Sequence, residues 1–320
     1  MASVRRLTLD LNLDLVASLV SSLDDAPRPT GFARLHGGST EVYRIDLADR
    51  PAPIVLKIYR DEPAWAPAKE ALVASWIAGH DLGVAIPRWL RLDESRTLLP
   101  LRYALITWLP GQTVRGLAGE PDIEAVYRRM GALLRRLHAI PMTAYGYILG
   151  DGIFEPRAAN ADYMIDAFER VFRRFRRQGG GEALADRLEA QARERYGLLD
   201  HAAGPVFCHD DFQPGNVLAA RDEAGELVPT GLVDFANALA GDALADLAKA
   251  LFCCAQEDPR SVAPLREGYG PIDHPEPDAA LWLYTLYHRL TMWTFLTRLG
   301  DDPASAGPAG LMADLAAMSR

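Results

Sequence analysis

The sequence predicts a two-lobed α+β fold, with a small strand-rich lobe (residues 1–109) before a larger helical lobe (residues 110–320). The chain of 320 residues is longer than the ~250–300 residues that one compact core usually supports. Strand-like apolar runs dominate before the Pro110-Gly111 turn, and helical periodicity dominates after it. We therefore expect two lobes that share a cleft.

The first lobe is predicted to begin with a short amphipathic helix, because residues 11–23 place apolar side chains at helical spacing. Alternation over Glu41–Leu47 and a compact β-branched run over 53–59 indicate two strands joined by a turn. A helix over 66–78 and a further strand over 102–108 complete this lobe.

The second lobe is predicted to be mostly helical. The strongest pattern covers residues 121–139, and further helices are expected over 161–177 and 182–199. A β-type region follows over about 206–235, and after it we expect only helices up to the C-terminus.

Composition excludes several classes of protein. The net charge of −9 argues against a chain built to bind nucleic-acid backbone. The three cysteines, two of them adjacent, lack metal-ligand spacing and indicate reduced thiols in a cytoplasmic protein. The sequence has no apolar stretch of the ~18 residues that a membrane span needs, so no membrane partner is expected. The oligomeric state is left open.

The stretch 206–234 carries the most informative polar residues. Two apolar strands flank a polar turn around Gly225, and Asn216 and Asp234 lie nine positions before and after it. In a hairpin centred on Gly225, these two side chains would meet at the open end. An amide oxygen beside a carboxylate suits Mg²⁺. Asp211 lies on the approach loop, where a second carboxylate could orient an incoming hydroxyl group.

A lysine in the middle of an apolar strand is the second signal. Lys57, Lys69 and Lys249 are the chain's only lysines among 34 basic residues, and Lys57 interrupts the run 53–59. A half-buried lysine needs a partner. Glu70, on the following helix, is the expected partner, and Glu62 is the alternative.

A glycine-rich turn precedes the first strand of this lobe. Gly37, Gly38 and Ser39 could let backbone N–H groups approach phosphates, although an ordinary turn explains the same residues. The stretch is not a Walker A loop, because no Gly-Lys-Ser/Thr follows.

These motifs resemble those of the aminoglycoside phosphotransferase family of the protein-kinase-like fold, which includes choline, homoserine, methylthioribose and fructosamine kinases. The resemblance covers residues 31–250 and rests on HDDFQPGNVL at 209–218, LVDF at 232–235 and the Gly241-Asp242 pair. The family pattern has glycine where this chain has Asp210.

The resemblance implies a role for each matching residue, with ATP or GTP as phosphate donor. Asp211 would be the catalytic base, Asn216 and Asp234 would hold Mg²⁺, and Lys57 held by Glu70 would contact the phosphates. The backbone of Thr107 and Leu109 would bind the nucleotide base. His209 and Asp242 are expected to be structural, Asp242 as a helix N-cap.

The sequence thus predicts a kinase that phosphorylates a hydroxyl group of a small molecule, first an aminoglycoside or similar antibiotic. A metabolic alcohol or sugar is the next acceptor. The remaining alternatives are an inactive nucleotide-binding module and a protein kinase, and the lack of an Ala-Pro-Glu segment argues against the latter. Candidate acceptor-binding acids are Asp162, Asp166, Glu169, Glu267, Asp273 and Glu276.

Overall fold

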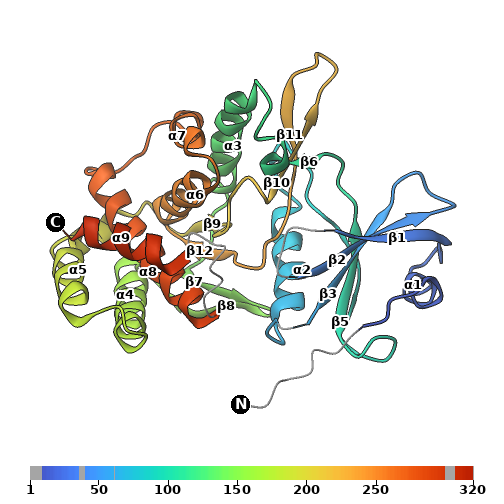
Figure 1. Cartoon of the computed structure of the whole chain (residues 1–320), viewed down its shortest axis with the longest axis horizontal. Helices are drawn as coiled ribbons and strands as arrows, with labels where there is room; N and C mark the ends of the chain where they lie inside the picture. The colour runs from blue at the N-terminus through green and yellow to red at the C-terminus, as the bar shows by residue number, and fades with distance from the viewer. Residues whose placement is uncertain (1–8, 36–39, 61, 300–306, 320) are drawn as a thin grey trace.

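The structure is a computed structural model that describes residues 9–35, 40–60, 62–299 and 307–319. Figure 1 shows a strand-rich N-terminal part beside a larger, mainly helical C-terminal part, so the predicted α+β architecture is confirmed. The division at residue 110 stays a prediction. Gly37, Gly38 and Ser39 lie outside the described residues.

The N-terminal part contains a five-stranded antiparallel sheet in the order β1-β2-β3-β5-β4. Three of its strands were predicted and are confirmed to within one residue at either end. The strands are β1 (Pro29–Leu35), β2 (Glu41–Leu47), β3 (Ile54–Tyr59), β4 (Trp89–Asp93) and β5 (Arg102–Thr107).

Strand β3 is buried on both faces, and this places its lysine. Side chains alternate along a strand, so Ile54, Leu56 and Ile58 share one face, which packs in the core under helix α1 (Leu13–Val20). Lys57 lies on the opposite face, which it shares with Val55 and Tyr59. The alternation therefore turns Lys57 away from the α1 side of the sheet.

Helix α2 (Ala66–Ile77) connects the sheet to the helical part. Its side chains Val73 and Ile77 are fully buried in the large hydrophobic core of the C-terminal part. Burial of side chains of this size contributes roughly 1.5–3 kcal/mol each, so this helix is firmly attached to the second core. Glu70 and Lys69 are carried on the same helix.

The C-terminal part is built mainly of helices around one core. The helices predicted over 121–139 and 161–177 are confirmed, whereas the one predicted over 182–199 ends at Glu194 and continues as a 3₁₀ helix, Tyr196–His201. The helices are α3 (Ile123–Leu137), α4 (Asn160–Arg177), α5 (Glu182–Glu194), α6 (Ala243–Glu257), α7 (Val262–Tyr269), α8 (Pro277–Leu299) and α9 (Gly307–Met318).

Two small sheets interrupt these helices. One has the order β11-β10-β6, and the other has the order β8-β7-β12-β9. The prediction that only helices follow residue 235 was wrong, because β12 pairs with β7 and β9 directly before α6. The strands are β6 (Gln112–Thr113), β7 (Tyr145–Leu149), β8 (Gly152–Arg157), β9 (Val206–Cys208), β10 (Val217–Arg221), β11 (Leu227–Leu232) and β12 (Leu239–Gly241).

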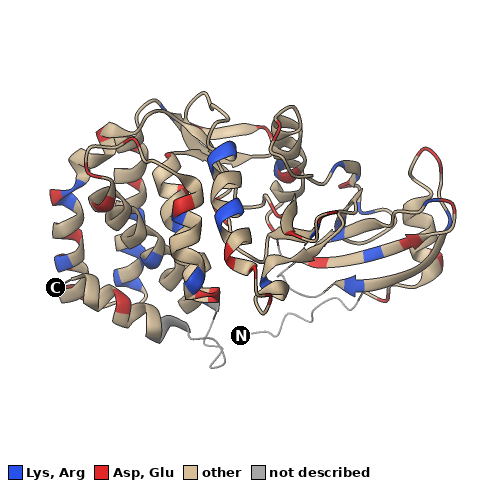
Figure 2. Ribbon diagram, turned by 90° about the horizontal axis from the view of Figure 1, so that it is seen from above, with Lys and Arg blue, Asp and Glu red and all other residues tan. Residues whose placement is uncertain are grey.

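Acidic and basic residues are interspersed along both parts of the molecule (Figure 2). The C-terminal half of α4 carries an arginine-rich face, and Arg176 on it forms ion pairs with Glu182, Asp186 and Glu189. Within the described residues, no helix is both long and apolar enough to cross a lipid bilayer.

Candidate active site

The predicted hairpin is present, but its pairing differs by one residue from the expected one. β10 and β11 pair antiparallel, Val217 opposite Leu232, and the Val233 N–H donates to the Asn216 carbonyl at 2.9 Å. Asn216 therefore lies opposite Val233 rather than Asp234. The turn is centred on Ala224 rather than Gly225, because Arg221 pairs with Leu227, and this register alone would place Asn216 opposite Leu232. A bulge recovers one of these two residues, because Thr230 is an extra residue on β11 between the pairs Leu218–Gly231 and Ala219–Pro229.

The bulge residue Thr230 is held by contacts outside the hairpin. Its carbonyl accepts the N–H of Ala85 at 3.0 Å, and its hydroxyl donates to the carbonyl of Pro110 at 3.0 Å. The Leu232 N–H also donates to the Ala85 carbonyl at 3.0 Å. The hairpin is thus attached both to the chain that precedes β4 and to the chain that follows β5.

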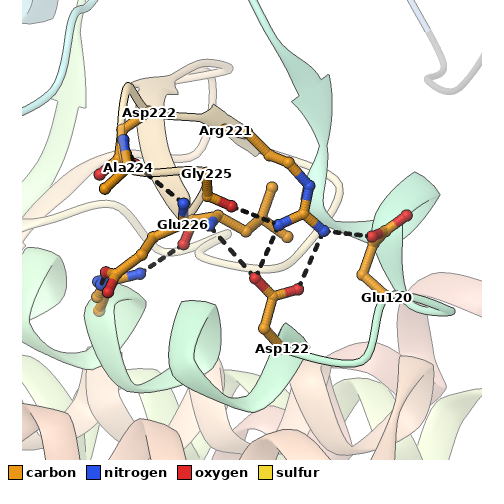
Figure 3. Close-up of polar contacts among 9 residues, drawn as sticks. Glu120, Asp122, Arg221, Asp222, Ala224, Gly225 and Glu226 are labelled. Carbon is orange, nitrogen blue, oxygen red and sulfur yellow. Dashed lines mark hydrogen bonds and ion pairs between the residues drawn. The ribbon is translucent and has the colours of Figure 1, made fainter.

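The closed end of the hairpin is an exposed ionic network (Figure 3). The Asp222 carboxylate accepts the N–H groups of Ala224 and Glu226, each at 2.9 Å, and so fixes the turn. Arg221 pairs with Asp122 at 3.0 Å and with Glu120 at 2.6 Å. These contacts tie the turn to the start of α3.

Asp211 and Asn216 meet at the open end, as the sequence predicted. The side-chain nitrogen of Asn216 donates to the Asp211 carbonyl at 2.8 Å and to its carboxylate at 3.0 Å. Gln213 donates to the other carboxylate oxygen at 2.9 Å. Burial raises the pKa of Asp211 above its ordinary value, against the opposing attraction of Lys249. The carboxylate is therefore oriented by two amide donors.

The predicted pairing of Lys57 with Glu70 is confirmed. The Lys57 Nζ lies 2.6 Å from the Glu70 carboxylate and 3.5 Å from that of Asp234. Burial opposes the charge on Lys57, but Glu70 and Asp234 outweigh it and raise the pKa of the lysine above its usual value. The same attraction lowers the pKa of Asp234. Glu62 instead accepts a hydrogen bond from the Thr40 hydroxyl at 2.7 Å.

The donor set at the open end fits a divalent cation such as Mg²⁺. The Asn216 amide nitrogen is used by Asp211, so the carbonyl oxygen is the amide atom left to bind a ligand. The Asp234 side chain is 44% exposed, and its φ of 67° is a left-handed conformation that few non-glycine residues adopt. Both groups offer the oxygen ligands that Mg²⁺ prefers.

His209 has a structural position, as predicted. Its ring is fully buried against Phe212 and Phe235, and its Nε2 lies 3.1 Å from the Val233 carbonyl. Its backbone N–H donates to Asp246 at 2.8 Å. The ring therefore spaces the catalytic-loop segment 209–216 from the strand that precedes Asp234.

Asp246, on α6, holds the start of this loop. Burial acts to raise its pKa, but hydrogen bonds from His138 and from the loop backbone outweigh burial and lower it. His138, Cys208 and Asp246 lie close enough to bind a metal ion. However, His138 already bonds Asp246 at 3.1 Å and Tyr269 at 2.8 Å, so the group forms a hydrogen-bonded network. Asp242 caps α6 by accepting the Leu244 N–H, as predicted.

Lys249 pairs with Asp210 and was not predicted as a site residue. Its Nζ lies 2.8 Å from the Asp210 carboxylate and also donates to the Asp210 backbone carbonyl. Burial opposes the charge of Lys249, but Asp210 raises its pKa above the ordinary value. The rarity of lysine in the chain could have pointed to this residue as it did to Lys57.

The third lysine, Lys69, also lies near this loop. It too was not predicted as a site residue. It is fully buried, and its Nζ has no hydrogen-bond partner among the described residues. The Nζ lies 3.6 Å from the ring centre of Tyr147, a cation–π geometry. Burial lowers the pKa of Lys69 to about 7, although Asp210 and Glu70 act to raise it.

The two residues predicted to contact the nucleotide base differ in their surroundings. The N–H of Thr107 donates to the Arg88 carbonyl at 3.0 Å, so it already has a partner. Within the described residues, no internal backbone hydrogen bond occupies Leu109. A base edge would therefore find free backbone groups at Leu109 rather than at the Thr107 N–H.

Solved structures with the same arrangement of elements are aminoglycoside phosphotransferases. A thermostable mutant of APH(4)-Ia, in complex with AMP-PNP and hygromycin B, has a TM-score of 0.69 at 18% identity, covering 95% of this chain and 97% of that one. A mutant of aminoglycoside 2'-phosphotransferase-IIIa with GDP has a TM-score of 0.67 at 16% identity, covering 96% and 98%. The gentamicin complex of APH(2'')-IIa has a TM-score of 0.63 at 15% identity, covering 98% and 97%.

These likenesses establish a protein-kinase-like fold. The sequence model of the phosphotransferase enzyme family matches residues 32–282, and the chain therefore belongs to that family. It is a phosphotransferase for small-molecule hydroxyl groups. No curated protein sequence matches the chain.

Proposed function

We propose that this enzyme transfers the γ-phosphate of ATP or GTP to a hydroxyl group of a small molecule at the open end of the β10–β11 hairpin. The observation that carries the proposal is the convergence of Asp211, Asn216, Asp234 and Lys57 there. These residues come from distant parts of the sequence, so it is the fold that brings them together. Family membership supports the reaction class.

Each of these residues has a task that its chemistry suits. Asp211 accepts a hydrogen bond from the acceptor hydroxyl and orients its oxygen for attack. Lys57, fixed by Glu70 at 2.6 Å, binds phosphate oxygens of the nucleotide. Leu109 receives the base through its backbone. Asn216 and Asp234 would hold Mg²⁺, which neutralises charge on the phosphates when it is bound.

An aminoglycoside is the first acceptor class to test. Solved structures similar to this chain include complexes with hygromycin B and with gentamicin. Two of the six acids suggested by the sequence are in ion pairs, Asp166 with Arg157 at 2.7 Å and Glu267 with Arg128 at 2.8 Å. Both pairs are exposed, so a polycation could still displace the arginines.

A compact alcohol without positive charge is the second candidate, and a specific cavity favours it. A cavity of about 60 Å³ lies beside the catalytic loop, and Tyr163, Tyr287 and the hydroxyl-bearing Thr291 are among the residues that line it. Its carboxylates are already engaged, Asp210 by Lys249 and Asp242 by Tyr284. The Thr291 hydroxyl lies near that of Tyr287, and the two could bind a polar group of the acceptor together.

The proposal is tested by replacing Asp211 with Asn, which keeps the shape of the side chain but removes the negative charge. We expect turnover to fall by about 10³-fold. Release of ADP or GDP in the presence of Mg²⁺ would be measured with a panel of aminoglycosides, neutral polyols and amino alcohols. Nucleotide binding, measured by a thermal shift, should be unchanged.

The matched control is Asp200→Asn, because Asp200 is exposed on the surface of the helical part. This variant should retain wild-type turnover. Near-wild-type turnover of Asp211→Asn with the best acceptor would refute the role of Asp211. A thermal shift with nucleotide but no turnover with any acceptor of the panel would instead support the inactive nucleotide-binding module.

A further inference from the structure

Asp210, which precedes the proposed catalytic residue, has a backbone conformation that its residue type disfavours. Its φ of 53° lies in the left-handed region. Glycine enters this region without cost, whereas a residue with a Cβ meets steric crowding there. Something outside the loop must therefore hold the backbone at Asp210.

All of the polar groups of Asp210 are bound by one helix, α6. Its N–H donates to the carboxylate of Asp246 at 2.9 Å. Its carbonyl accepts a hydrogen bond from the Lys249 ammonium, which also lies 2.8 Å from its carboxylate. Lys249 follows Asp246 by three positions, and residues at that spacing lie on the same face of a helix.

The contact with the carbonyl bears directly on Asp211. The Asp210 carbonyl and the Asp211 N–H belong to one planar peptide unit, so a group that fixes the carbonyl also fixes the start of Asp211. The Asp211 side chain is held separately, by Gln213 and Asn216. Asn216 also donates to the Asp211 carbonyl, which belongs to the peptide that follows Asp211. Lys249 thus anchors the peptide that precedes Asp211, which neither amide contacts.

We infer that Lys249 is a positioning residue for phosphoryl transfer, which holds the Asp210–Asp211 peptide so that the Asp211 carboxylate faces the acceptor. This inference rests on the proposed function of Asp211. Lys249 acts through the backbone of the loop and does not touch the nucleotide. It therefore differs in task from Lys57, which pairs with Glu70 and Asp234 and for which phosphate binding is proposed.

A set of three variants tests the inference: Lys249→Met, Asp210→Gly and the double variant. Lys249→Met should lower kcat about 10–100-fold and leave the KM for nucleotide unchanged, because a displaced catalytic group slows chemistry without weakening donor binding. The double variant should recover kcat to within about fivefold of wild type. Glycine adopts a φ of 53° without help, and the double variant buries no unpaired charge.

Turnover would be followed as ADP or GDP release with Mg²⁺ and the fastest acceptor of the panel, or with water if no acceptor reacts. Arg193→Met, an exposed cation-to-Met change on α5, is the matched control and should leave kcat unchanged. Unchanged kcat in Lys249→Met would overturn the inference. A loss of kcat in Lys249→Met that the double variant fails to restore would also overturn the inference, because Lys249 would then act in another way.

If Lys249→Met does not fold, the inference is tested by the double variant alone, from its kcat relative to that of wild type. Loss of activity in Asp211→Asn together with normal kcat in Lys249→Met would remove only the positioning role. Normal activity in Asp211→Asn would remove the proposed function itself, so the two failures are distinguishable.

Discussion

The two ends of the β10–β11 hairpin both gather charged side chains, but in opposite surroundings. At the open end, Lys57 and Glu70 are buried, with side-chain exposures of 9% and 3%, and the pKa of each is shifted. At the turn, Arg221 and Asp122 are 45% and 35% exposed. Water screens the second pair and is largely excluded from the first.

The difference shows that the number of ion pairs says little about their importance. A buried pair depends on each partner, because removal of one leaves the other as an uncompensated charge. An exposed pair gains little, because its charges are well solvated when they are apart. The functional end of the hairpin is therefore expected to be sensitive to single substitutions, and the turn is expected to tolerate them.

Lys57→Met should have the largest effect of the substitutions that separate the two ends. It removes the cation between Glu70 and Asp234, so the phosphates lose a ligand and Glu70 loses its partner. We expect turnover to fall at least ~10²-fold and the free energy of unfolding to fall by about 3 kcal/mol. Steady-state kinetics and urea unfolding would measure the two effects.

The stability loss of Lys57→Met should persist in 1 M NaCl, since salt does not screen a buried pair effectively. Glu70→Gln serves as the companion variant and should show a smaller loss of turnover, because Lys57 keeps its contact with Asp234. Wild-type turnover in Lys57→Met would contradict the contrast between the two ends.

Lys69→Met should have an effect of intermediate size on the free energy of unfolding, and it should stabilise the protein. The substitution replaces a buried ammonium that has no hydrogen-bond partner among the described residues. We expect the variant to be more stable than wild type by about 1–3 kcal/mol at pH 7. The measurement is urea unfolding of both proteins at pH 7 and pH 9.

The advantage of Lys69→Met should shrink as pH rises. The pKa of Lys69 is about 7 in the folded protein and near its ordinary 10.5 when unfolded. Between these values the unfolded chain binds one more proton, so wild-type stability increases with pH there. If the difference in free energy of unfolding between Lys69→Met and wild type widened from pH 7 to pH 9, this would show that Lys69 is paired in solution.

Arg221→Met should have the smallest effect. It removes the exposed contacts to Asp122 and Glu120 shown in Figure 3 and should cost at most ~1 kcal/mol of stability. Turnover should stay within about twofold of wild type, and the stability difference should vanish in 1 M NaCl. A loss as large as that of Lys57→Met would remove the distinction between the two ends.

The sequence predicts the site as far as local patterns reach. Lys57 stands out because it interrupts an apolar strand. Asp211 and Asn216 stand out by their spacing before the β10–β11 hairpin. The pairing of Asp234 was one residue out because the turn is centred one residue earlier than predicted, and the bulge at Thr230 offsets only half of the resulting two-residue shift. The bulge itself depends on contacts that Thr230 makes with Ala85 and Pro110. Such tertiary contacts leave no periodic signal.

The missed elements have the same cause. β12 is three residues long and exists only because it pairs with β7 and β9, which are distant in sequence. Lys249 contributes to the site only through its contact with Asp210, which lies 39 positions earlier in the sequence. A short strand cannot be recognised before the fold brings its partners into contact. The rarity of lysine marks Lys249 as unusual, but it does not reveal the partner.

The attachment of Thr230 has a consequence for how substrates enter and leave. Ala85 and Pro110 hold the hairpin to both chain segments that lead to and from the sheet. Separation of the two parts at this edge would break these hydrogen bonds together. We therefore expect any relative motion of the sheet and the helical part to be smallest at this edge and larger at the opposite rim.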